Sequence, residues 1–89
     1  MRASADAIRY TMWYVYILLC SDGSHYVGCT SDLKDRLARH NASQVEYTKT
    51  RLPVKLSFYA AFPDKYKAFE FEKYLKSGSG RAFTNKHFL

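Results

Sequence analysis

Five side chains in this sequence have the types and the spacing to act together on a phosphate group. They are two tyrosines in β-type segments, an arginine and a histidine four positions apart in a helical segment, and a glutamate in a second helical segment: Tyr16, Tyr26, Arg36, His40 and Glu72. A phenol or an imidazole can transfer a proton, a guanidinium matches phosphate oxygens, and a carboxylate can hold a divalent cation. Each residue type also has a purely structural use, so the elements that position them must be considered.

The two tyrosines lie in a predicted β-hairpin. Residues 13–20 are dense in β-branched and aromatic side chains, which fit a pleated and mostly buried strand. Asp22-Gly23 is typical of a turn, and residues 24–29 form the returning strand.

The register of this hairpin decides whether the tyrosines can share a site. A strict two-residue turn pairs positions whose numbers add to 45, and it sends Tyr16 and Tyr26 to opposite faces of the sheet. A three-residue or bulged loop pairs positions that add to 46, with both hydroxyls on one face and Gly28 opposite Leu18. A shared site requires the second register. Tyrosines also pack on sheets with no further role, which is their more frequent use.

A helix is predicted to follow the hairpin and to run through about Ala42. Thr30 or Ser31 is expected as its N-cap, with Asp32 in the first turn, where the helix dipole favours an acidic side chain.

Arg36 and His40 lie on the flank of the apolar stripe that Leu33 and Leu37 form on this helix. A side chain on such a flank is held by the core while its polar end stays at the rim, which suits a guanidinium that binds phosphate. The alternative is an ordinary solvated helix face.

The rest of the chain predicts one more strand and one more long helix. Residues 43–52 are polar and indicate a loop with at most one helical turn, and Val54 to Phe62 is expected as the third strand. Lys65 to Lys76 is expected to be a helix that glycine ends at residues 77–80, with a short helix in the tail, residues 81–89. The order ββαβα predicts an α/β (α+β) fold, a small three-stranded antiparallel sheet flanked by helices. Residues 1–11 are expected to be a flexible extension and residues 12–89 a single domain.

Glu72 lies at the edge of the buried face of this second helix, which Ala68, Phe71 and Leu75 are expected to form. Magnesium often takes only one or two protein carboxylates, so a single glutamate is sufficient for one ion. Glu72 could equally pair with Lys76 one turn later. No second acidic residue is clearly placed beside it, which argues against a site for two metal ions.

Composition favours a polyanionic partner. The chain of 89 residues has a net charge of +6, and the segment from Lys65 onward contains six lysines and arginines but only two glutamates. The two cysteines, Cys20 and Cys29, are too few for a disulfide scaffold and match no zinc spacing, so they are interpreted as small hydrophobes in a reducing compartment, the cytoplasm. The longest apolar run is about half a membrane span, and no membrane association is expected.

The same five residues carry a resemblance to the GIY-YIG endonuclease superfamily. Tyr14-Val-Tyr16, nine residues and Tyr26-Val-Gly28 are followed by the helical Arg36 and His40-Asn41. The motifs continue through Tyr47-Thr48, residues 53–56, Glu72-Lys73 and residues 76–80. The chain is most similar to the compact single-domain, excision-nuclease-like subgroup, over about residues 12–84.

The resemblance implies a role for each residue. Tyr16 and Tyr26 would be the two motif tyrosines, with Tyr26 favoured as general base, although the choice among Tyr26, Tyr16 and His40 stays open. Arg36 would stabilise charge on the scissile phosphate, His40 would assist proton transfer, and Glu72 would hold one Mg²⁺ or Mn²⁺. A free phenol has a pKa near 10, so a tyrosine base needs a cation close by. Asn85 matches a polar residue of the last helix only loosely.

The implied activity is metal-dependent hydrolysis of DNA or RNA, with DNA favoured, in repair, recombination or nucleic-acid processing. Tyr14 stands where the family name has glycine, and Cys29 stands where repair-type members often carry lysine, which leaves more of the proton handling to His40. A module of this size with no appended DNA-binding domain is expected to bind weakly, or to act as a homodimer or with a recruiting partner.

Two other functions remain open at this level. The first is a non-catalytic nucleic-acid-binding module on the same scaffold, whose binding would be steeply salt-dependent and indifferent to Glu72. The second is a basic protein-interaction domain whose tyrosines serve the core alone.

Overall fold

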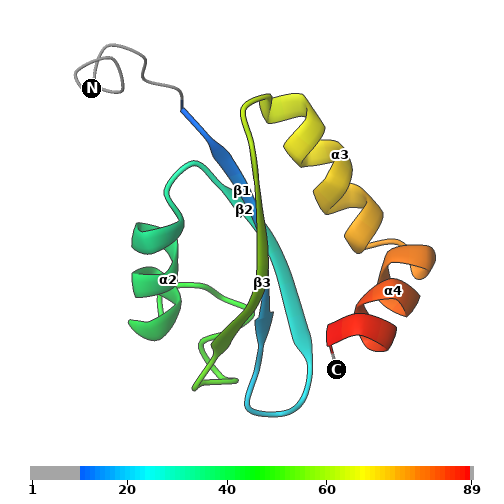
Figure 1. Ribbon diagram of the computed structural model, residues 1–89. Helices are drawn as coiled ribbons and strands as arrows, with labels where there is room; N and C mark the ends of the chain where they lie inside the picture. Colours follow the sequence, from blue (N-terminus) through cyan, green and yellow to red (C-terminus); the bar gives the residue numbers. More distant parts are fainter. Residues whose placement is uncertain (1–10, 89) are drawn as a thin grey trace, which may run out of the picture.

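The computed structural model describes residues 11–88, and Figure 1 shows a small sheet with helices on both sides. The elements along the chain are β1 (Trp13–Leu19), β2 (His25–Thr30), α2 (Leu33–Asn41), β3 (Lys55–Phe62), α3 (Lys65–Leu75) and α4 (Gly78–Phe88). Both strand pairs are antiparallel and the strand order is β2-β1-β3. The expected fold class, a three-stranded antiparallel sheet flanked by helices, is therefore confirmed. Most of the predicted extension, residues 1–10, lies outside the described part of the chain.

The central strand β1 supplies both faces of the sheet with buried side chains. Val15 and Ile17 point to the face that α3 covers, where they pack against Ala68 and Leu75 of that helix. The alternate positions point to the other face, the side on which α2 lies (Figure 1). The expected inward face of α3 is confirmed. On the opposite side of the sheet β1 places Tyr16 and Leu18, and both are fully buried.

The hairpin register places Tyr16 and Tyr26 on one face, as a shared site requires. The expected pairing of Gly28 with Leu18 is wrong, however, because Gly28 pairs with Tyr16 and Leu18 pairs with Tyr26. The paired positions add to 44, not to 45 or 46. A three-residue loop, residues 21–23, causes this shift. The Cys20 amide donates to the Ser24 carbonyl at 2.9 Å, so the closing pair is 20 with 24, one position earlier on each strand than the pair 21 with 25 that the sum of 46 requires.

The N-cap of α2 is Asp32, and the expectation of Thr30 or Ser31 is wrong. The Asp32 carboxylate accepts a hydrogen bond from the Asp35 amide at 3.0 Å. Thr30 uses its hydroxyl instead to accept a bond from the Asp32 amide at 3.1 Å. A carboxylate is a strong acceptor for an unpaired amide at a helix start, so the acid serves as the cap and not as a first-turn residue.

The break between α3 and α4 is shorter than predicted. The C-cap of α3 is Lys76, with right-handed helical backbone angles, and Gly78 already begins α4. The expected left-handed glycine cap is therefore wrong. Gly80 is needed for close packing instead, because a Cβ there would lie 2.5 Å from the Leu75 Cα. The last helix, which begins at Gly78 and not near residue 81, thus rests directly on the final turn of α3 (Figure 1).

The polar segment after α2 forms turns, as predicted. A single helical turn is marked by the Lys49 amide, which donates to the Val45 carbonyl at 2.9 Å. This segment crosses the same face as α2 and brings Tyr47 and Thr48 to the sheet. Within residues 11–88, no helix combines the length and the apolar character needed to cross a bilayer.

Candidate active site

Tyr16 is the centre of a polar cluster on the α2 side of the sheet. Its side chain has no solvent exposure, and its hydroxyl lies 3.0 Å from Nε2 of His40, which is also fully buried. The ring has room because its strand partner is Gly28, where a Cβ would lie 2.5 Å from Cζ of Tyr16. The glycine of the second tripeptide, Tyr26-Val-Gly28, therefore has a steric purpose, which is to make room for the Tyr16 phenol of the first tripeptide.

The other nitrogen of His40 is held by Thr48. Nδ1 of the imidazole lies 2.7 Å from the Thr48 hydroxyl, which can donate to the Val45 carbonyl at 3.5 Å. In that arrangement the threonine oxygen accepts the proton of Nδ1, and Nε2 is left as an acceptor for the phenol of Tyr16. The three side chains then form one chain of hydrogen bonds from β1 to the loop: Tyr16 donates to His40, His40 donates to Thr48, and Thr48 donates to the Val45 carbonyl.

Tyr26 borders the cluster on its more open side. Its half-buried ring lies 5.0 Å from the His40 ring and 6.2 Å from the Tyr16 ring, measured between centroids. On its other side it contacts the exposed Tyr47, at a centroid distance of 5.6 Å. Tyr26 is therefore the phenol of the pair that a bound molecule can reach.

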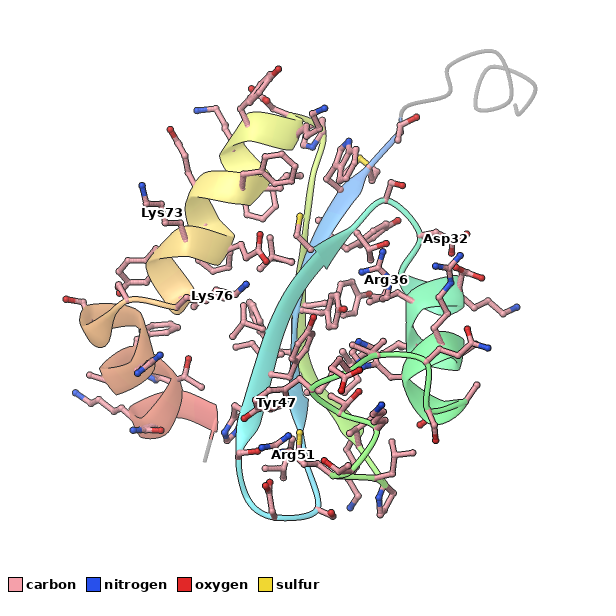
Figure 2. The ribbon with its side chains drawn as sticks, turned by 180° about the vertical axis from the view of Figure 1, so that it is seen from behind. Asp32, Arg36, Tyr47, Arg51, Lys73 and Lys76 are labelled. Atoms are coloured by element: carbon pink, nitrogen blue, oxygen red, sulfur yellow. The ribbon has the colours of Figure 1, made fainter. Side chains whose placement is uncertain are left out.

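Arg36 extends from α2 toward the sheet, as Figure 2 shows. The neighbouring Arg39 pairs with Asp35 on the exposed face of the helix at 3.0 Å, whereas Arg36 is half-buried and joins no ion pair among residues 11–88. Its charge acts on the cluster instead, where hydrogen bonding and attraction from its guanidinium favour the Tyr16 phenolate. The helix thus separates one paired surface arginine from one directed inward.

Burial controls the protonation of the two enclosed groups. It raises the pKa of Tyr16 to about 12, Tyr26 raises it further, and the hydrogen bond and charge of Arg36 oppose this increase without cancelling it. Burial also lowers the pKa of His40, and the positive charge of Arg36 lowers it further. At neutral pH the cluster therefore contains a protonated phenol and an uncharged imidazole.

Glu72 lies in α3, which covers the other face of the sheet, so the structure does not place it in the cluster itself. Its carboxylate pairs with Lys76 at 3.0 Å, and its side chain retains 23% exposure. Its negative charge raises the pKa of Tyr16 and, after burial, is the next cause that raises the pKa of Cys29. The carboxylate therefore lies near β2, across the strand from the phenols. The thiol next to it is neutral and does not replace the missing lysine.

Sequence reasoning identified four residues that converge and one that approaches from the far side of β2. The alternative use foreseen for Glu72, a pair with Lys76, is present. Thr48 belongs to one of the sequence motifs, but its contact with His40 could not be predicted, because a loop hydroxyl eight positions after a histidine carries no periodic signal. Asn85 lies on a groove that Tyr26 also borders.

Comparison with known proteins identifies the family of this chain. The model of the GIY-YIG catalytic domain matches residues 12–86, a span that contains both tyrosine motifs, the arginine helix and the glutamate helix. A UPF0213 protein of Lacticaseibacillus paracasei is 49% identical over 65 residues, which are 72% of this chain and 73% of that protein. One of Streptococcus pneumoniae is 47% identical over 64 residues, 71% of this chain and 65% of the other.

A solved structure is also similar. The solution NMR structure of a UPF0213 protein from Bacillus halodurans has a TM-score of 0.55 and 38% identity, and the match covers 84% of this chain and 81% of that one. Because the family model covers most of the chain and these relatives are similar over most of its length, the chain belongs to the family of the GIY-YIG catalytic domain.

Proposed function

We propose that this protein is a metal-dependent endonuclease that hydrolyses phosphodiester bonds, with DNA as the favoured substrate. The observation that carries the proposal is the buried hydrogen bond of 3.0 Å between Tyr16 and His40, with Tyr26 packed on the imidazole. Such a polar assembly is expensive to bury for structure alone, and Arg36 adds a cation beside it.

The two tyrosines would have different tasks. Tyr16 is enclosed, and its pKa of about 12 keeps it protonated, so it serves as a fixed hydrogen-bond donor. Tyr26 borders the open groove and is the phenol that can meet a water molecule. We assign Tyr26 as general base, with the neutral His40 beside it to support the transfer of the proton.

Arg36 would stabilise the charge that develops on the phosphate. A guanidinium directed into a half-buried site interacts more strongly with an anion than one in open solvent does. Its partner in this mechanism is the substrate and not a protein carboxylate, because the acid on its own helix already pairs with Arg39.

The family implies a divalent ion, and Glu72 is the residue that would hold it. Within residues 11–88 no three His, Cys, Asp or Glu side chains gather into a metal-binding group. In this proposal the protein contributes one carboxylate, that of Glu72. That donor set fits an ion such as Mg²⁺, which retains several waters and takes further oxygens from a substrate phosphate. When bound, the ion would supply positive charge to the phosphate and the leaving oxygen. Lys76 must release Glu72 for this to happen.

The test compares cleavage of single-stranded, duplex, flapped and branched DNA and of RNA, with Mg²⁺ or Mn²⁺ present. We expect Arg36→Ala to lose about 10²–10³-fold of the activity, while Arg39→Ala on the exposed face of the same helix keeps it. Glu72→Ala should lose activity in the same way, and both variants should stay folded by circular dichroism. Cleavage that survives in both variants, or that occurs equally with EDTA, would refute the proposal; salt-dependent binding without cleavage would assign a binding module instead.

A further inference from the structure

A groove of about 680 Å³ runs beside the candidate active site, between the start of β2, the loop after α2 and the junction of α3 with α4. The side chains that matter for its chemistry are two aromatic rings, two cations, a hydroxyl and an amide: Tyr26, Tyr47, Lys76, Arg81, Thr84 and Asn85. The volume lies within the usual range of ligand sites, roughly 300–1,000 Å³. The wall is polar enough to recognise more than an apolar group.

Two residues that line this groove each carry a buried polar atom with no hydrogen-bond partner among residues 11–88. These atoms are the hydroxyl oxygen of Thr84, a residue with only 4% exposure, and Nε2 of His25. A buried polar group without a partner costs about 1–3 kcal/mol, and native proteins contain few of them. Two such groups beside one groove leave hydrogen-bonding capacity that a polar group of a ligand could use.

The aromatic wall offers a stacking surface. Tyr26 and Tyr47 lie 5.6 Å apart between ring centroids, at 38° to each other. Arg51 fixes Tyr47, since its guanidinium lies 4.0 Å from the ring centroid and it also donates to the Tyr47 carbonyl at 2.5 Å. Figure 2 shows this pair beside the hairpin end of the sheet. An aromatic ring held in this way suits a nucleobase, which stacks on tyrosine with little dependence on sequence.

The opposite wall offers positive charge. Lys76 and Arg81 border the groove from the junction of α3 and α4, and Asn85 adds an amide that can pair with a base edge or a sugar hydroxyl. Lys76 also contacts Glu72, while Tyr26 belongs to the phenol cluster. The groove is therefore continuous with both halves of the candidate active site.

We infer that this groove binds one unpaired nucleotide next to the scissile bond, with its base against Tyr26 and Tyr47, its phosphate near Arg81 and a polar group bonded to Thr84. The inference rests on the proposed function and names its substrate class: nucleic acid with a single-stranded or flapped nucleotide at the cleavage point. A base inside a duplex is stacked on both sides and cannot enter such a groove without extrusion from the helix.

Binding without cleavage tests this inference separately. Fluorescence anisotropy would follow labelled eight-nucleotide single strands of DNA and of RNA, and a DNA duplex, in EDTA. We expect both single strands to bind more tightly than the duplex. Arg81→Met should weaken single-strand binding by about tenfold, whereas Lys86→Met, which removes the same charge from an exposed position of α4 outside the groove wall, should change it less than about twofold.

Thr84→Val supplies the second arm, because it keeps the shape and removes the unpaired hydroxyl. Single-strand affinity should fall about threefold to tenfold, while the melting temperature stays level or rises. Equal losses in Arg81→Met and Lys86→Met would leave only a general charge effect and overturn the inference, as would unchanged affinity in Thr84→Val. If no nucleic acid is cleaved while these binding effects hold, the proposed function is refuted and the inference about the groove is kept. If cleavage depends on Arg36 but the groove variants bind normally, the proposed function is kept and the inference about the groove is refuted.

Discussion

Gly28→Ala tests the geometry on which the site depends. The added Cβ would lie 2.5 Å from Cζ and 2.9 Å from Cε1 of Tyr16, and it would also overlap the hydroxyl. Tyr16 is fully buried and held by His40, so the ring has no free space into which it can move. The substitution should therefore break the hydrogen bond of 3.0 Å or shift β2 away from β1.

The expected cost follows from overpacking a filled core, which is typically about 1–3 kcal/mol. For a domain of this size, each kcal/mol corresponds to a change of about 4–8 °C in melting temperature, so Gly28→Ala should melt roughly 4–24 °C lower. Gly78→Ala is the matched control, since a Cβ there meets no atom within 4 Å and helix propensity favours alanine. It should leave the melting temperature unchanged or raise it slightly.

A double-mutant cycle measured by urea unfolding locates the cause. Tyr16→Leu removes the ring that the added methyl group would strike, so Gly28→Ala should cost much less in the Tyr16→Leu background than in the wild type. The coupling free energy should recover most of the cost of the single substitution. Strict additivity would show that the new methyl group does not meet the ring of Tyr16. It would refute the conclusion that Gly28 is needed to make room for this ring.

Three further predictions concern the buried phenol, the ion pair and the helix junction. The folded state keeps the Tyr16 proton up to about pH 12, whereas a phenol in the unfolded chain loses it near pH 10. The contribution of this group to the free energy of unfolding is therefore complete below pH 10, and it declines by about 2–3 kcal/mol as pH rises toward 12. Chemical unfolding measured from pH 9 to 12 should show this decline in the wild type, and Tyr16→Phe should lack it. Lys76→Met frees Glu72, so the Mg²⁺ concentration for half-maximal cleavage should fall about twofold to fivefold, the equivalent of a partly exposed ion pair; an unchanged or higher requirement would contradict this competition. Gly80→Ala places a methyl group against the backbone of Leu75, which cannot move aside as a side chain can, so calorimetry should show a loss of about 1–3 kcal/mol or more.

Most of the fold could be predicted from local patterns. β1 is recognisable from its β-branched and aromatic residues, and Ala68 and Leu75 are recognisable as the buried face of α3. The placement of Tyr16 and Tyr26 on one face depended on the hairpin loop, which pattern alone left undecided between two registers. The observed pairing matched neither register, because the loop closes at Cys20 and Ser24.

The candidate site was predictable in part, since a family resemblance could name its residues but could not place them. Arg36 and His40 were expected at the rim of α2, yet His40 is fully buried, because its two nitrogens find partners that lie far away in the sequence. The groove was not foreseen. It is formed by side chains from β2, the loop and α4, and no spacing along the chain encodes such a meeting.

The burial of His40 has a consequence for how α2 is attached. It is the one buried residue of that helix, so an imidazole stands where most amphipathic helices have an aliphatic anchor. The bonds from its ring to Tyr16 and Thr48 tie the helix and the following loop to β1. Function and attachment then rest on the same few atoms. A change that alters proton handling at this ring also loosens the helix that carries Arg36, so selection on either property acts on both.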